Sequence, residues 1–174
     1  MSKRQRGRPK GSVGKAAILS SAQIRDVLRS ARRHGKHSHL AELVLALSIQ
    51  LGLRATELAS LQWADVYNSD GIVRHAIRVN RAYIRGARSC AELVIPQKLR
   101  GLLADYREKQ TSHGNGVQIP LFRSRRGGHM TAASMARFVT GLYRKAGIAD
   151  GSSRSGRRTL IGGLFEIGEI GINR

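Results

Sequence analysis

The sequence predicts one α+β domain that is mostly helical and carries a small antiparallel sheet. Apolar residues recur at helical spacing in the first third of the chain, alternate with polar residues between positions 72 and 95, and return to helical spacing afterwards. A length of 174 residues suits one ordinary domain with a tail, and 41% hydrophobic residues allow it a real core. We therefore expect helices, then a small sheet, then helices again.

Two helices and a short third helix are predicted before the sheet. Ser20 or Ser21 can cap the first helix, whose apolar residues are Ile24, Val27, Leu28 and Ala31. Ser38 can cap the second helix, whose apolar residues are Leu40, Leu43, Val44, Leu47 and Leu51. Gly52 then interrupts the pattern, and residues 54–61 are predicted to form the short helix.

The sheet and the later helices follow from changes in this pattern. Residues 72–79 and 92–95 are predicted as strands, and the arginine-rich stretch 81–88 is predicted to turn between them at Gly86. Pro96 suits the first turn of a helix that runs to about residue 110. Thr131 can cap a helix over residues 132–145, which Gly147 ends. A loop over residues 151–156 leads into a final apolar stretch.

Charge is the strongest signal in the composition. Lys and Arg total 31 against 11 Asp and Glu, which gives a formal net charge of +20. This surplus indicates a polyanionic partner, because each contact with a phosphate releases condensed counterions. A ribosomal protein or a membrane-surface protein could have the same balance, so charge alone does not decide between them.

Other bulk features bear on the location of the protein. Cys90 is the single cysteine, which excludes an internal disulfide and suits a reducing cytosol. No apolar run approaches the ~20 residues needed to span a bilayer, and no apolar segment follows the basic N-terminus to make a secretory signal. We expect a cytoplasmic protein with no membrane partner.

Residues 1–19 are predicted to be a basic, disordered arm, and residues 20–174 the folded domain. The arm contains Lys3-Arg-Gln-Arg-Gly-Arg-Pro-Lys10, whose Arg-Gly-Arg-Pro core resembles an AT-hook. In that motif an extended Arg-Gly-Arg lies in the narrow minor groove of A·T-rich DNA, where the negative potential favours arginine. Arg6, Arg8 and Lys10 are therefore candidate DNA contacts. A solvated tail that binds phosphates without specificity is the alternative.

The first segment that carries chemistry is Leu51-Gly-Leu-Arg-Ala-Thr-Glu-Leu-Ala-Ser-Leu-Gln-Trp-Ala-Asp65. Its glycine places Arg54 at the start of the short helix, where the helix dipole also favours an anion. Glu57 lies one helical turn further on and could hold the guanidinium of Arg54 in one orientation. By spacing alone, a surface ion pair of little energetic weight explains the same pattern.

The second segment is Ser152-Ser-Arg-Ser-Gly-Arg-Arg-Thr-Leu-Ile161, which contains Arg154 and Arg157. Arginine stays protonated near neutral pH, so these side chains can hold an anion but cannot exchange a proton. A solvated basic loop is the alternative.

Together the two segments resemble the two arginine boxes of the tyrosine recombinases, the phage-integrase family, in their order and separation. The resemblance covers residues 20–174 and includes Pro120-Leu-Phe-Arg-Ser-Arg-Arg-Gly-Gly128 between the boxes. It implies the catalytic-domain fold of that family, with Arg54 and Arg157 clamping the scissile phosphate and Glu57 supporting them. Arg154 occupies the place of the family's histidine, which is a departure from the pattern.

The resemblance also implies a role for the predicted hairpin, which in the family carries a lysine that protonates the leaving oxygen. No lysine lies between Lys36 and Lys98, and Arg85 is the nearest counterpart. Arg85 would be a poor general acid because the pKa of a guanidinium is too high. With Arg81 and Arg88 it could still contact DNA, and an ordinary exposed hairpin is the alternative.

The family's nucleophile is a tyrosine several tens of residues beyond the second box, and it has no counterpart among these residues. Position 174 lies only 17 residues after position 157 (174 − 157), and all four tyrosines, at 67, 83, 106 and 143, precede that box. Cleavage in this family needs a covalent phosphotyrosine. We therefore expect a truncated, catalytically incomplete relative of the integrases of mobile elements.

Two functions are expected on these grounds. The first is a nucleoid-associated protein of the recombinase family, in DNA integration and recombination, that binds double-stranded DNA and other recombinase protomers. The alternative is a non-catalytic accessory protein that binds DNA through its basic arm. We expect no cofactor and no small-molecule substrate. We also expect no metal, because His34, His37 and His39 cluster without cysteines or paired acids.

Overall fold

The computed structural model describes residues 16–84, 87–110, 119–124 and 127–163, and for residues 80–90 it describes no side chains. It confirms the predicted fold class: a mostly helical α+β domain with a small antiparallel sheet. In chain order the elements are α1 (Ser21–Arg32), the 3-10 turn η1 (Gly35–His37), α2 (Ser38–Gln50), α3 (Ala55–Ser60), α4 (Trp63–Val66), β1 (Ala76–Ile84), β2 (Ala87–Val94), α5 (Gln97–Glu108), α6 (Ala132–Lys145) and α7 (Ser155–Ile161).

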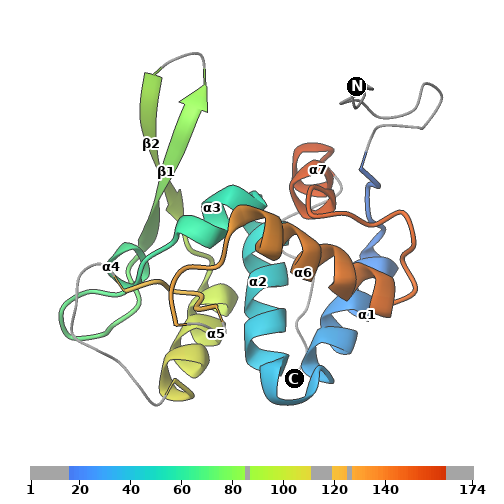
Figure 1. The fold of residues 1–174 in the computed structure, drawn as a ribbon, viewed down its shortest axis with the longest axis horizontal. Helices are drawn as coiled ribbons and strands as arrows, with labels where there is room; N and C mark the ends of the chain where they lie inside the picture. Colours follow the sequence, from blue (N-terminus) through green and yellow to red (C-terminus); the bar gives the residue numbers. More distant parts are fainter. Residues whose placement is uncertain (1–15, 85–86, 111–118, 125–126, 164–174) are drawn as a thin grey trace, which may run out of the picture.

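Helix α2 is the centre of the helical part, and α1, α5, α6 and α7 pack around it (Figure 1). All nine residues from 41 to 49 are buried, so the helix is enclosed on every side. The predicted pattern of one apolar stripe understates this burial, since a helix that is apolar all round lies in a core. The charged residue among the nine, Glu42, accepts a hydrogen bond from the Arg32 guanidinium at 2.7 Å.

The ends of the helices agree with the predicted caps in α1 and α6. Ser20 caps α1 by accepting a hydrogen bond from the backbone N–H of Gln23 at 3.2 Å, and Thr131 caps α6 in the same way. Ser38 does not cap α2: it is the first helical residue and follows directly on η1. Helix α7 begins at Ser155, inside the stretch predicted as a loop.

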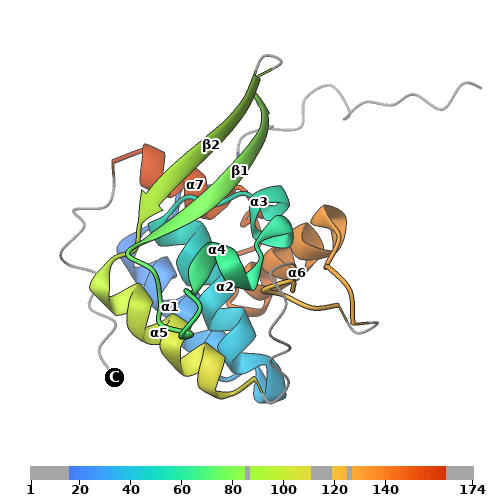
Figure 2. The same cartoon turned by 90° about the vertical axis from the view of Figure 1, so that its left-hand side faces the viewer.

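Strands β1 and β2 pair antiparallel and form a hairpin that projects from the helical part (Figures 1 and 2). Ile77 and Val79 are buried, whereas Arg78 is exposed and pairs across the strands with Glu92 at 3.0 Å. The strands reach further toward the tip than predicted, so Arg81 and Arg88 lie on strands and not in a turn. The backbone hydrogen bonds between the strands continue past the residues in which apolar and polar side chains alternate, and the predicted strand ends relied on that alternation.

Residues 16–19, expected to belong to a disordered arm, are part of the folded domain. Leu19 is buried, and its backbone N–H donates a hydrogen bond to the Thr159 hydroxyl at 2.9 Å. The preceding residues, 1–15, lie outside the described part. Of the helices that are described, none is long and apolar enough to cross a membrane.

Three tyrosines lie in the core. The Tyr67 hydroxyl donates to the carbonyl of Leu103 at 2.8 Å, and the Tyr106 hydroxyl donates to that of Leu121 at 3.1 Å. Tyr143 is fully buried between α6 and its neighbours. Burial raises the pKa of Tyr106 to about 12 and raises the pKa of Tyr67 and of Tyr143 well above the ordinary value.

We expect the folded state to lose stability as the pH rises above about 10. A phenol whose pKa is raised by folding stabilises the folded state fully below its unfolded pKa of about 10, and this contribution disappears as the pH rises through the folded pKa. The phenolate absorbance should therefore rise near pH 10 in denaturant and at higher pH in buffer. A titration in buffer that coincides with the one in denaturant, with unchanged circular dichroism, would contradict the burial of these tyrosines.

Candidate nucleic-acid interface

Arg54 follows a tight turn between α2 and α3. Gly52 in this turn has a φ of 64°, which lies in the left-handed region that favours glycine. Leu51 and Leu53 on either side of it are buried, whereas Arg54 is exposed and precedes the first residue of α3. The two leucines anchor the turn in the core, and the turn places the arginine at the surface.

Glu57 supports the backbone at the start of α3. Its carboxylate accepts a hydrogen bond from the backbone N–H of Arg54 at 2.7 Å, and the side chain is buried. An acidic side chain at this position also interacts favourably with the helix dipole. Glu57 thus fixes the residue from which the Arg54 side chain extends. Orientation of the guanidinium itself by Glu57 remains a prediction.

Helix α7 packs closely against α2 through its small residues. A Cβ atom on Gly156 would lie 2.9 Å from backbone atoms of Ser48, so only glycine fits at this approach. The buried Ser155 hydroxyl accepts a hydrogen bond from the backbone N–H of Ser152 at 3.0 Å. Thr159 is buried and donates to the carbonyl of Ser155 at 2.8 Å. The close approach at Gly156 places the helix that carries Arg157 against α2, and the two hydrogen bonds stabilise its first turn.

Arg157 joins the two sequence segments directly. Its Nη1 donates a hydrogen bond to the carbonyl of Gly52 at 2.9 Å, across 105 positions of the chain. A Cβ atom on Gly52 would lie 2.9 Å from Cδ2 of Leu160 and 3.6 Å from Cγ of Arg157. The absence of a side chain at position 52 therefore lets α7 approach the turn before Arg54.

A surface groove of about 920 Å³ lies where the start of α3 meets α6 and α7. We call it the arginine groove, because Arg54, Arg154, Arg157 and Arg158 line it. Its other lining residues in the described part of the chain are small or apolar or carry a hydroxyl, and none of these is acidic: Ala16, Ala55, Thr56, Ala132, Ala136, Ser153 and Ile161. Four cations around one hollow attract a polyanion strongly.

The structure thus brings together three predicted site residues: Arg54, Arg154 and Arg157. The sequence reasoning missed Arg158 and Ala16. Arg158 was visible as the second arginine of the Ser-Gly-Arg-Arg-Thr run, and its guanidinium donates a hydrogen bond to the carbonyl of Ala16. No sequence signal marked Ala16, because its place depends on a contact across 142 positions.

The DNA contacts of all the predicted site residues stay predictions, and the structure does not describe the side chains of the remaining ones. Arg6, Arg8, Lys10 and Arg85 lie outside the described residues, as do the side chains of Arg81 and Arg88. The hairpin that carries the last two projects from the same side of the molecule on which α3 and α7 lie (Figures 1 and 2).

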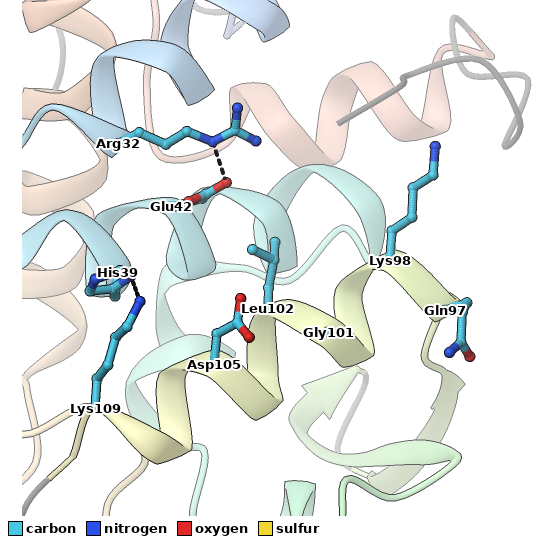
Figure 3. Close-up of a pocket in the computed structure, with 9 residues that line it drawn as sticks. All are labelled: Arg32, His39, Glu42, Gln97, Lys98, Gly101, Leu102, Asp105 and Lys109. Carbon is cyan, nitrogen blue, oxygen red and sulfur yellow. Dashed lines mark hydrogen bonds and ion pairs between the residues drawn. The ribbon is translucent and has the colours of Figure 1, made fainter. Parts of the chain in front are cut away.

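A second hollow, of about 510 Å³, lies beside α2 and α5 and contrasts with the arginine groove in charge (Figure 3). Two of its three Lys and Arg residues have partners within it: Arg32 pairs with Glu42 at 2.7 Å, and Lys109 lies 3.2 Å from His39. Asp105 adds a second carboxylate to the lining. Because the charges are mixed, this hollow attracts a polyanion less than the arginine groove does.

Two of the three clustered histidines face lysine side chains. Nδ1 of His34 lies 3.4 Å from Lys145, whereas Nδ1 of His39 faces Lys109. Burial, and then the charge of Lys145 and His37, lower the pKa of His34. Within the described ranges, no group of three or more His, Cys, Asp or Glu could hold a metal ion.

Solved structures with the same fold include recombinases and integrases. The chain matches XerA recombinase with a TM-score of 0.63 at 19% identity, over 88% of this chain and 50% of XerA. It matches XerH recombinase, bound to its difH substrate before cleavage, with a TM-score of 0.59 at 16% identity, over 82% and 40% of the two chains. For the lambda integrase catalytic core the TM-score is 0.57 at 14% identity, over 83% and 80%.

This chain therefore spans about half the length of XerA. No protein-family model matches it, and no curated protein matches its sequence. At such low identities the likeness establishes the fold, which is that of integrase catalytic domains.

We expect Gly52→Ala to destabilise the protein more than Gly35→Ala does. Both glycines have nearly the same φ, 64° and 63°, so alanine costs about 1–2 kcal/mol of backbone strain at either position. Only at Gly52 does the new Cβ atom also meet Leu160, which adds roughly 1–3 kcal/mol of overpacking. Chemical denaturation measures both free energies of unfolding. Equal decreases in the free energy of unfolding would show that α7 does not pack tightly against the turn at Gly52.

Proposed function

We propose that this chain binds double-stranded DNA through the arginine groove, as the phosphate-binding part of a tyrosine-recombinase catalytic domain. One observation carries the proposal: the two arginine segments, far apart in the sequence, meet in one groove and are joined by the hydrogen bond from Arg157 to Gly52. The two segments on which the sequence resemblance depends therefore lie next to each other in space. A DNA partner also suits the net charge of +20.

The chemistry of the groove suits a phosphate of the DNA backbone. A guanidinium presents its N–H donors in a planar fork that matches two phosphate oxygens. Arg54 and Arg157 on two walls could hold one phosphate from two directions, and Arg154 adds a third cation. In strand exchange such groups would stabilise the charge that develops on the phosphate in the transition state.

Structures of the same fold support DNA as the partner. XerH was solved on its difH substrate, and lambda integrase was solved as a dimer on a core site. By analogy, a second protomer could share the DNA with this chain. The proposal places the protein with the nucleoid in the cytoplasm.

We further propose that these 174 residues supply no nucleophile. The hydroxyls of Tyr67 and Tyr106 are engaged with backbone carbonyls in the core, and Tyr143 is buried. None of these three lines the arginine groove, and the side chain of Tyr83 lies outside the described part. Arg154, in the place of a histidine, keeps a positive charge but transfers no proton near neutral pH. The groove is therefore proposed to hold DNA without cutting it.

We expect Arg54→Ala and Arg157→Ala to weaken DNA binding. Each removes one contact with a phosphate, so the slope of log K against log salt should fall by about 0.9 per contact. Fluorescence anisotropy of a labelled duplex at several salt concentrations measures both affinity and slope.

Arg144→Ala is the matched control for these two variants. It also removes one positive charge, but Arg144 is exposed on the last turn of α6 and does not line the groove. Its effect should be small. If all three variants lose affinity equally, net charge and not the groove binds the DNA.

We expect no covalent protein–DNA adduct when the chain is incubated with a nicked duplex that traps a phosphotyrosine. A recombinase with its tyrosine, on its own target site, serves as the positive control for trapping. An adduct visible on a denaturing gel, and lost in Tyr83→Phe, would identify Tyr83 as a nucleophile and would overturn this part of the proposal.

A further inference from the structure

The arginine groove has an apolar lining beside its four cations. Five of its lining residues carry only carbon atoms in their side chains: Ala16, Ala55, Ala132, Ala136 and Ile161. Ile161 is the largest of them, and it ends α7 with 69% of its surface exposed. A partner that covers this lining gains free energy from the apolar surface that it removes from water.

The exposure of Ile161 differs from that of an isolated apolar side chain, which is common on protein surfaces. The described part of the chain has four exposed large apolar residues, and of these only Ile161 lines the groove: Ile18, Ile72, Val94 and Ile161. Ile18 adds apolar surface at the same end of α7, because its Cδ1 would lie 3.6 Å from a Cβ atom on Gly162. The exposed carbon is therefore concentrated beside the proposed phosphate site.

Ile161 lies one helical turn beyond Arg157. The two residues are four positions apart on α7, so their side chains extend from the same face of the helix. One turn of an α-helix rises about 5.4 Å. In a DNA strand each phosphate is bonded directly to a sugar on either side. A group about one helical turn away from a held phosphate is therefore well placed to contact a neighbouring sugar.

We propose that the apolar lining of the groove packs against a deoxyribose of the DNA strand, next to the phosphate that Arg54 and Arg157 hold, with Ile161 as its main contact. This inference rests on the proposed function of the groove and adds the sugar of the backbone to the phosphate. Deoxyribose suits the lining because its C2′ atom bears no hydroxyl and presents carbon to Ile161. Contacts with sugar and phosphate position a protein on DNA and carry no sequence preference.

The variant Ile161→Ala tests the contact, with affinity for a labelled duplex measured at several salt concentrations. It removes three carbon atoms and no charge. We expect affinity to fall roughly five- to ten-fold, as it would if about half of the removed surface were buried against the sugar. The slope of log K against log salt should not change, because an apolar contact releases no counterions.

The groove variants separate this inference from the proposed function. Unchanged affinity of Ile161→Ala, with affinity lost in Arg54→Ala, would overturn the sugar contact and leave the phosphate site supported. If Arg54→Ala and Arg157→Ala bind DNA normally, the proposed function itself fails, whatever Ile161→Ala does.

Ile72→Ala is the matched control. It makes the same change at an isoleucine of similar exposure, 64%, that does not line the groove, and it should leave affinity unchanged. The denaturation midpoint of Ile161→Ala should equal that of the unmodified chain, because an exposed side chain contributes little to stability. A clear drop in that midpoint would show that the chain itself covers Ile161. Self-association without DNA that Ile161→Ala abolishes would show that a second copy covers it. Either result would overturn the inference.

Two duplexes, one with only A·T pairs and one with only G·C pairs, distinguish the sugar from a base. We expect Ile161→Ala to lose the same factor of affinity on both, because the deoxyribose is the same in each. A loss confined to the A·T duplex would identify the thymine methyl group as the partner of Ile161 and would overturn the sugar contact.

Discussion

The close approach of α7 to the turn at Gly52 is the contact on which the proposed site depends. It requires glycine twice, once at Gly52, where a Cβ atom would meet Leu160, and once at Gly156, where it would meet the backbone of Ser48. The bond from Arg157 to the Gly52 carbonyl is then possible, and it sets the distance between Arg157 and Arg54. A phosphate has fixed dimensions, so two arginines can share it only if their backbones are held at a matching distance. The two glycines therefore contribute to the proposed phosphate binding indirectly, by allowing the backbones that carry the arginines to approach each other.

The positions of several acidic residues help to explain why the arginine groove is positively charged. Several of the few acids in this basic chain are engaged elsewhere: Asp26 pairs with Arg29, Glu42 with Arg32 and Glu92 with Arg78, while Glu57 bonds to a backbone N–H. None of them lines the arginine groove, whose four guanidinium groups therefore repel one another. Two of the four donate to backbone carbonyls, those of Gly52 and Ala16, which carry only partial negative charge. A bound phosphate would relieve this repulsion, and binding that favours the folded state also stabilises it.

Local patterns predicted the parts of the fold that depend on neighbouring residues. The caps Ser20 and Thr131 could be predicted because each capping bond spans only three positions. The two arginine segments could likewise be recognised from their own residues. Features that depend on distant contacts were missed. Leu19 is packed in the core, and its N–H donates to Thr159, which lies 140 positions away. Likewise, the four-residue helix α4 begins where the backbone N–H of Trp63 donates to the carbonyl of Ile119. No window of sequence contains both partners of such contacts.

The proposed site separates two properties, phosphate binding and proton transfer. Holding a phosphate needs positive charge in a fixed place, whereas moving a proton needs a pKa near the working pH. Arg154 in the arginine groove meets the first requirement and fails the second, because a guanidinium remains protonated throughout the physiological range. The described lining of the groove contains no histidine, so its charge does not change between mildly acidic and mildly basic conditions. The proposed hold of the groove on DNA is therefore the same across this pH range.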